Sequence, residues 1–146
     1  MNYNIETYNP NQLAKVKVPS ADVLEYLKEE GIRELINNHY ELLKLSGIKD
    51  MFPQTDKGFE MAKKHSADFF IQLMGGPKFF TETRGNPMMR RRHDPFEITP
   101  EARIIWLECY IEALEKTNAP DTIKQSYWDY VNTFSTWMIN TQSKIE

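Results

Sequence analysis

The spacing of apolar residues constrains the fold of this 146-residue chain more than any other feature. Residues 57–74 are the clearest case, because side chains on one face of a helix recur there at steps of three or four. The residues on that face are Phe59, Ala62, Ser66, Phe69 and Leu73. The same period runs through residues 32–43 and 123–138, and strand-like alternation is confined to residues 15–18. The sequence therefore predicts an all-α chain with helices packed around one core.

Capping residues mark the start of the predicted helices in the first half. Ser20, which follows a proline, is a suitable cap for a first long helix, and we expect that helix to bend at Gly31. The second helix is expected to end at Gly75-Gly76-Pro77, since glycine and proline are typical of helix ends. These boundaries predict two long helices before residue 78.

The second half contains more helix breakers. Between residues 78 and 98 the glycine and prolines leave room for only one short helix, from Met88 to His93. Thr99-Pro100-Glu101 combines a hydroxyl cap, a proline and an acid, which is typical of a helix start. That helix is expected to reach about Lys116, and Pro120-Asp121 begins the last one.

Length and composition indicate one domain of ordinary soluble character, with 40% apolar and 27% charged residues. We expect residues 1–18 to form a weakly structured extension and residues 19–146 to form the domain. The net charge of −3 favours neither nucleic acid nor an anionic membrane as partner, and no window resembles a membrane span or signal peptide. Cys109 is the single cysteine, so we expect a reduced, cytoplasmic protein without a disulfide.

The three histidines, His39, His65 and His93, lack the spacing of familiar metal motifs. The chain contains no HxxxH, HExxH, CxxC or Glu-x-x-His pattern, which argues against zinc and di-iron carboxylate sites. It also lacks a Walker loop, a nucleophile elbow and a GxGxxG motif. The absence of CxxCH excludes standard covalent attachment of a c-type haem.

His93 has the most unusual setting of the three. It ends the short helix, because Pro95 disfavours a helical conformation at the preceding residue. A histidine in a last helical turn can donate one ring N–H to a backbone carbonyl and point its other nitrogen outward. The preceding arginines, residues 90–92, are either a solvated charge run or a holder for an anion. Haem would supply both an iron and two carboxylates.

The ordered motifs resemble those of the group II truncated haemoglobins. Gly75-Gly76-Pro77, Arg84-Gly85-Asn86-Pro87 and the run from Arg90 to Phe96 are similar to the family's GGP…GHPxLRxRHxPF segment. Trp106-Leu107-Glu108-Cys109 matches its W-L-x-C context, and Met51-Phe52-Pro53 matches its lFP corner. Tyr40 lies at the position of the family's F-Y tyrosine. The resemblance covers about residues 30–142.

The resemblance implies a truncated globin fold, a two-over-two helical sandwich around non-covalent haem b. It implies that His93 is the proximal iron ligand and that Phe52 packs on the porphyrin. It also implies that Tyr40 and Trp106 form the distal hydrogen-bonding pair. The remaining implied positions are Ala62 at the distal gate, Ser66 one turn beyond it, Arg92 as propionate partner, and Met61, Phe69, Leu73, Met89 and Phe96 as pocket walls.

Several residues depart from the family pattern. His39 replaces the usual phenylalanine before the tyrosine, Asn86 replaces a histidine, and Phe80 replaces a tyrosine. Ser66 is small and polar, which leaves the distal network around it open. His65 lies on the same predicted helix at the pocket rim, where it either contacts a propionate or faces solvent.

Two distal donors predict slow release of O2, which suits redox chemistry or sensing better than delivery. The expected ligands are O2, NO and CO, and repeated NO dioxygenation would require a reductase partner. The alternatives are a haem peroxidase-like enzyme and a non-haem helical interaction or sensor module on a globin fold. The sequence leaves open whether the chain is a monomer or a homodimer.

Overall fold

The computed structural model describes residues 1–142, and its regular elements are all helical. The six α-helices are α1 (Ala21–Leu43), α2 (Asp56–Leu73), α3 (Phe79–Arg84), α4 (Met89–His93), α5 (Pro100–Glu115) and α6 (Asp121–Phe134). Two 3-10 turns, η1 (Lys49–Met51) and η2 (Ser135–Met138), complete the described part of the chain. Since residues 1–142 contain no strand, the predicted all-α class is confirmed.

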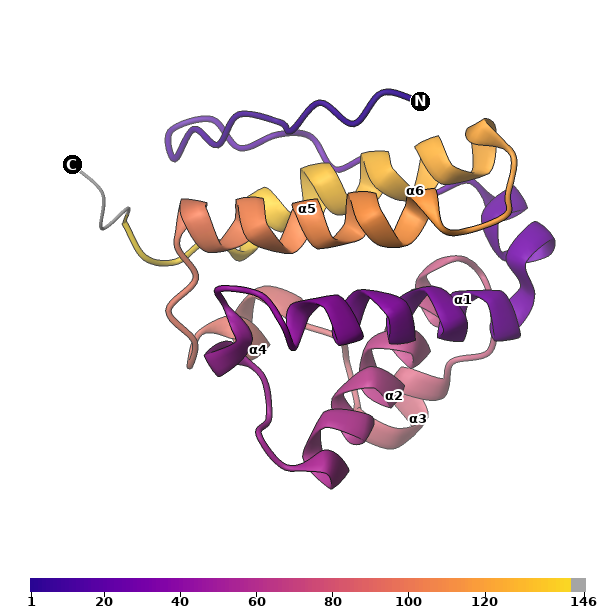
Figure 1. Ribbon diagram of the computed structural model, residues 1–146, viewed down its shortest axis with the longest axis horizontal. Coiled ribbons are helices and arrows are strands. Elements are labelled where there is room, and N and C mark those ends of the chain that lie inside the picture. The colour runs from indigo at the N-terminus through magenta and orange to yellow at the C-terminus, as the bar shows by residue number, and fades with distance from the viewer. Residues whose placement is uncertain (143–146) are drawn as a thin grey trace.

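The long helices form two pairs (Figure 1). Helices α5 and α6 contact each other in one pair, α1 and α2 contact each other in the second, and α1 packs against both helices of the first pair. The shorter helices α3 and α4 follow α2 and lie in the connection that leads to α5. This arrangement is the expected two-over-two sandwich, with one core between the pairs.

Residues at helical spacing on the facing sides of these helices make up the main core. On α5 the fully buried side chains include Leu107, Tyr110 and Leu114, and on α6 Tyr127 and Val131 take the equivalent place. Burying a large apolar side chain contributes roughly 1.5–3 kcal/mol, so these faces hold the pairs together. Pairing at this core places the C-terminal end of α1, the middle of α2 and the N-terminal part of α5 around the candidate site.

The observed helix caps agree with those predicted from the sequence, whereas the position of the bend in α1 does not. The Ser20 and Thr99 side chains accept hydrogen bonds from the backbone N–H groups of Asp22 and Ala102, as N-caps do. The backbone of α1 leaves the helical conformation at Lys28, with φ 62° and ψ 175°, so the expectation of a bend at Gly31 was wrong.

Helix α3 was not predicted. It spans Phe79–Arg84, lies between Pro77 and Gly85, and has Phe80 as its buried residue. Gly85 adopts φ +82° directly after its last turn, a conformation that glycine reaches without strain. The glycine and prolines of this region therefore lie at the ends of two short helices, α3 and α4, and within neither of them.

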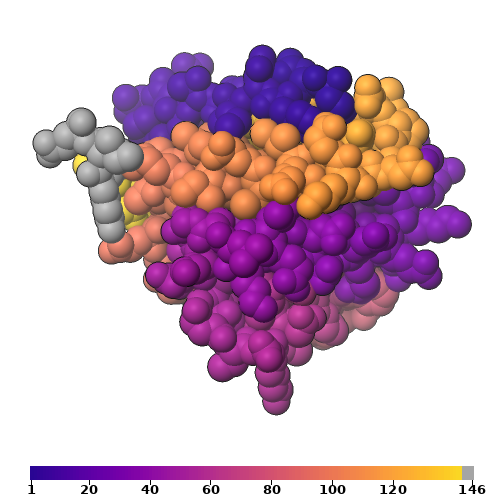
Figure 2. Space-filling model, viewed as in Figure 1, coloured from indigo at the N-terminus to yellow at the C-terminus, as the bar shows by residue number. Residues whose placement is uncertain are grey.

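The N-terminal segment, residues 1–20, has no helix or strand, yet it is held along the pair formed by α5 and α6 (Figures 1 and 2). The side-chain amide of Asn132 accepts from Glu6 N–H at 2.8 Å and donates to the Asn4 carbonyl at 2.8 Å. Further along the segment, Trp137 Nε1–H donates to the carbonyl of Ala14. None of the helices within residues 1–142 combines the length and apolar character needed to cross a membrane.

Candidate functional site

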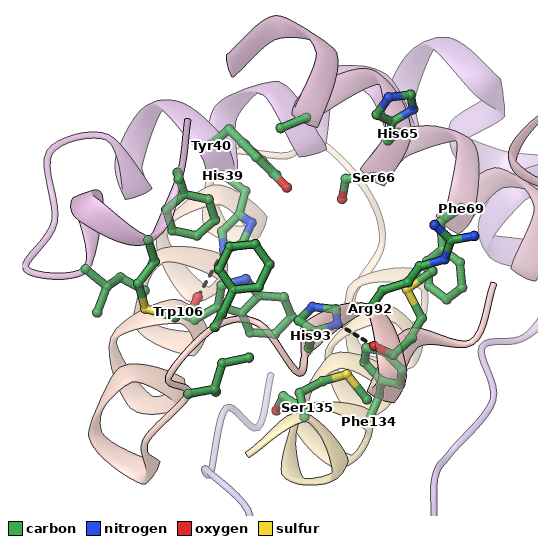
Figure 3. A pocket seen from close by; sticks show the side chains of 18 of the residues that line it. His39, Tyr40, His65, Ser66, Phe69, Arg92, His93, Trp106, Phe134 and Ser135 are labelled. Atoms are coloured by element: carbon green, nitrogen blue, oxygen red, sulfur yellow. Dashed lines mark hydrogen bonds between the residues drawn. The ribbon is translucent and has the colours of Figure 1, made fainter. Parts of the chain in front are cut away.

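A cavity of about 380 Å³ lies between the helix pairs and the segment around α4 (Figure 3). Its size falls in the range of small-molecule sites, and most of its wall is apolar. The structure brings most of the predicted site residues together in this wall. They are Tyr40, Phe52, Ala62, His65, Ser66, Phe69, Met89, Arg92, His93, Phe96 and Trp106.

His93 adopts the arrangement that its place in the sequence predicts. Its Nδ1 lies 2.6 Å from the carbonyl oxygen of Met89, one turn earlier in α4, so Nδ1–H donates to that carbonyl. A neutral imidazole has a single N–H, and Nε2 therefore keeps its lone pair free for a metal. Helix α4 itself starts from Met88, which adopts a left-handed conformation with φ 39°.

Asn140 supports the loop that follows His93, although it lies 47 residues further along the chain. Its side-chain Nδ2 donates to the carbonyls of Phe96 at 2.8 Å and His93 at 3.1 Å. Its Oδ1 accepts from Ile98 N–H at 2.9 Å. Sequence reasoning missed this residue, because nothing local to Asn140 indicates which distant carbonyls it reaches.

Tyr40 reaches the cavity from α1, opposite the α4 side. Its ring meets Phe52 and Phe59 edge-on, with centroids 5.6 and 5.7 Å apart. Burial raises the pKa of the Tyr40 hydroxyl, and a side-chain hydrogen bond with Ser66 partly offsets this rise. The two hydroxyl groups point toward one another in Figure 3. Tyr40 therefore remains a protonated donor at neutral pH.

Trp106, on α5, lies beside a second aromatic group that the sequence did not assign to the site. His39 is 1% exposed, lines the cavity and meets the Trp106 ring edge-on at a centroid distance of 5.2 Å. Its Nε2 lies 3.0 Å from the Trp106 carbonyl oxygen. Burial lowers the pKa of His39 to about 3, an effect that the bond to Trp106 only partly opposes, so the imidazole is neutral.

Two arginines at the cavity mouth, Arg92 and Arg84, make different contacts. Arg92 donates from Nε to the Pro87 carbonyl at 2.6 Å, and its Nη2 donates to the carbonyls of Arg84 and Asn86 at 2.7 and 2.8 Å. These bonds hold the turn before α4. Arg84, which was not among the predicted site residues, also lines the cavity. Burial lowers the pKa of His65 nearby, and the positive charge of Arg84 adds to this effect.

Two residues expected in the pocket wall lie outside it. Met61 is 43% exposed, because it is one position from Ala62 and so points about 100° away from the cavity-facing side of α2. Leu73 shares that side but lies one turn past Phe69, where it packs against the main core. Neither residue lines the cavity, so the expectation for both was wrong. Within residues 1–142 no group of three or more His, Cys, Asp or Glu side chains could hold a metal ion.

Comparison with known proteins agrees with this geometry. The sequence profile described as bacterial-like globin matches residues 27–140. The group 2 truncated hemoglobin YjbI of Bacillus subtilis is 32% identical over 117 residues, which make up 80% of this chain and 86% of that protein.

Solved structures show the same similarity. The crystal structure of phosphate-bound Hell's gate globin IV aligns with a TM-score of 0.88 and 36% identity, over 98% of this chain and 90% of that one. The truncated oxygen-avid haemoglobin of Bacillus subtilis aligns with a TM-score of 0.75 and 28% identity, over 81% of this chain and 98% of that one.

Proposed function

The chain belongs to the bacterial-like globin family and is a group II truncated haemoglobin, and on this basis we propose that it holds haem b non-covalently through His93 and binds O2, NO or CO. The observation that carries the proposal is the bond between His93 Nδ1–H and the Met89 carbonyl, since it leaves Nε2 free in the cavity wall. A histidine oriented in this way is a typical axial ligand of haem iron.

The remaining wall fits a porphyrin. Phe52, Phe69 and Met89 present apolar surface to the cavity, as the faces of the macrocycle require. Arg84 and His65 lie at the mouth of the cavity. The Arg92 side chain donates from Nε and Nη2 to backbone carbonyls, so Arg84 supplies a second guanidinium group at the mouth. We therefore assign Arg84, together with the Arg92 charge, to the haem carboxylates.

Tyr40 and Trp106 are the proposed donors to the gas. When bound, haem iron would supply one open coordination position for a diatomic ligand. The Tyr40 hydroxyl stays protonated through burial, and both side chains line the cavity. Donors fixed by packing stabilise charge that develops on O2, so they slow its release. The similarity to an oxygen-avid haemoglobin supports this direction.

Slow release favours a redox or sensing role over oxygen delivery. Repeated NO dioxygenation is one such role, and it would require a separate reductase as electron donor. Cys109 is the single cysteine of the chain, which favours a reducing compartment such as the cytoplasm.

The test is addition of haem to the purified full-length chain, followed by absorption spectra of the ferric, ferrous and O2-exposed forms. We expect a sharp Soret band for the natural protein and loss of stable haem in His93→Ala. The control is His65→Ala, which removes a histidine at the rim and should retain the band. Native spectra in His93→Ala would refute the ligand assignment, and no Soret band in the natural protein would refute the whole proposal.

A further inference from the structure

Arg103, near the start of α5, is a buried arginine in the cavity wall. It is 4% exposed, and it lines the cavity together with Trp106, one turn further along α5. Its Nε donates to Ser135 Oγ at 2.8 Å, and its Nη1 donates to the Glu6 carbonyl at 2.8 Å. Its Nη2 donates to the backbone carbonyl of Asn132 at 2.6 Å and to the side-chain oxygen at 3.2 Å. These four bonds fix the guanidinium group beside the wall, because Ser135 lines the cavity as well.

The four acceptors around Arg103 are all uncharged: two carbonyls, an amide oxygen and a hydroxyl. The ion pairs within residues 1–142 do not include Arg103. Burial lowers the pKa of Arg103 to about 10, and the charge of Glu6 opposes this effect. Arg103 is therefore a cation at neutral pH. The Glu6 side chain is exposed, so water screens its charge, and the buried cation has no buried counter-charge.

The other arginines of the wall differ from Arg103 in this respect. Arg84 is exposed and Arg92 is half-buried, and both are assigned above to the two haem carboxylates, which would compensate their charge. Arg103 would keep its net charge when haem is bound. A charge acts without contact, and burial reduces its screening by salt and water. A unit charge at about 10 Å in an effective dielectric of about 20 changes a binding equilibrium by roughly tenfold.

The bonds of Arg103 also have a structural consequence, which a test must separate from the effect of its charge. They join the N-terminal segment to α5, to the last turn of α6 and to η2. A purely structural role would require these hydrogen bonds but not the positive charge. An electrostatic role requires the charge at this place, whichever side chain supplies it. Variants that change the charge at constant size therefore distinguish the two roles.

We propose that Arg103 determines the charge preference of the cavity: its buried positive charge makes the haem site favour small monovalent inorganic anions over neutral ligands of similar size. This inference rests on the proposed function, because it requires haem in the cavity. It adds a ligand class, small anions, to the neutral gases O2, NO and CO. Arg103 acts through its field, so the proposal requires no hydrogen bond between Arg103 and the ligand.

The first test changes Arg103 itself in the haem-loaded protein. Azide is the anionic probe, titrated into the ferric form and followed at the Soret band, and CO on the ferrous form is the neutral probe. In Arg103→Gln we expect azide affinity to fall by roughly tenfold and CO affinity to stay within about twofold. Arg103→Lys shortens the side chain but retains the cation, so its azide affinity should lie within about threefold of the natural protein.

The second test leaves Arg103 in place and decides the question if its variants do not retain haem. Ser135→Asp puts a carboxylate beside Arg103 Nε, whereas Ser135→Asn adds an uncharged group of the same size. We expect azide to bind roughly tenfold more weakly to Ser135→Asp than to Ser135→Asn. The proposal is overturned if azide and CO weaken together in Arg103→Gln, if Arg103→Lys resembles Arg103→Gln, or if the two Ser135 variants bind azide equally.

The reduction potential gives a readout that involves no added ligand. A buried cation stabilises the electron of the ferrous form, so the potential of Ser135→Asp should lie below that of Ser135→Asn by about 59 mV, which is the equivalent of tenfold for one electron. Equal potentials would overturn the proposal. The Soret band separates the two levels of failure: its absence in the natural protein refutes haem binding, whereas its presence with unchanged charge preference refutes only the role of Arg103.

Discussion

The two sides of the cavity are built in different ways. In the proposed function the side formed by α4 is proximal to the iron and the side formed by α1 is distal. On the proximal side, His93 bonds to Met89 four residues earlier, and Arg92 bonds to carbonyls between residues 84 and 87. On the distal side, His39 bonds to Trp106 across 67 residues, and Tyr40 interacts with Ser66 on another helix. The proximal side is therefore mainly a local structure, whereas the distal side exists only when α1, α2 and α5 have packed.

This difference predicts where substitutions act. Changes on the distal side should alter ligand binding or pH dependence while the proximal bonds survive. Changes on the proximal side should alter the stability of one loop and the retention of haem. Substitutions on each side of the cavity test that division.

The largest effect is expected from removing both distal donors. In Tyr40→Phe combined with Trp106→Phe, the O2 dissociation rate should rise by about a hundredfold or more, because each charge-assisted hydrogen bond contributes on the order of 1.5–3 kcal/mol. Stopped-flow displacement of O2 by CO measures this rate. The spectrum of the ferrous CO-free form, which depends on His93, should stay unchanged. An unchanged release rate would contradict the distal role of both residues.

The second test is the loss of folding stability in acid. The buried His39 determines whether stability rises or falls as the pH is lowered. Burial lowers the His39 pKa from 6.5 to about 3, so below pH 6.5 the unfolded chain binds a proton that the folded chain does not. Stability contributed by the neutral ring is therefore complete above pH 6.5 and is lost as the pH falls toward 3.

Between pH 6.5 and 5 this loss amounts to about 2 kcal/mol, at 1.36 kcal/mol per pH unit. The unfolding free energy of His39→Phe, measured with urea, should fall over this pH range by that amount less than the unfolding free energy of the natural protein. His65→Gln is the control, because His65 lies at the rim and its lowered pKa should contribute less. Parallel pH profiles for His39→Phe and the natural protein would contradict the buried neutral state.

The third prediction concerns Asn140 on the proximal side. Asn140→Ala removes the three bonds to His93, Phe96 and Ile98, which should lower the unfolding free energy by roughly 2 kcal/mol and speed haem loss to an acceptor such as apomyoglobin. Asn11→Ala, at an exposed turn, serves as control. Haem loss at the natural rate would show that the loop holds without this support.

The smallest effect is expected at Met88. Its left-handed φ of 39° is unfavourable for a side chain, and the side chain is 51% exposed, so Met88→Gly should raise stability by about 1 kcal/mol. Differential scanning calorimetry would show the higher Tm. The neighbouring Met89→Gly should have the opposite sign, because Met89 is helical and lines the cavity. A lower Tm for Met88→Gly would mean that its side-chain contacts outweigh the strain.

The sequence alone was sufficient for the helical class, for most helix boundaries and for the position of His93 at the end of a short helix. These depend on interactions within a few residues: the caps at Ser20 and Thr99, the apolar period of α2, and the proline that ends α4. The family motifs then identified Tyr40 and Trp106 as members of one pocket, which the structure bears out as far as their shared place in the cavity wall.

Only the tertiary structure decided how the pocket is completed. The sequence placed Met61 and Leu73 in the wall, but the rotation and length of α2 direct them elsewhere. It marked His39 only as a departure from its relatives. The packing of α1 on α5 buries the His39 ring and places its Nε2 3.0 Å from the Trp106 carbonyl oxygen. Tautomer, burial and partner depend on residues far apart in the chain, and a local pattern contains none of that information.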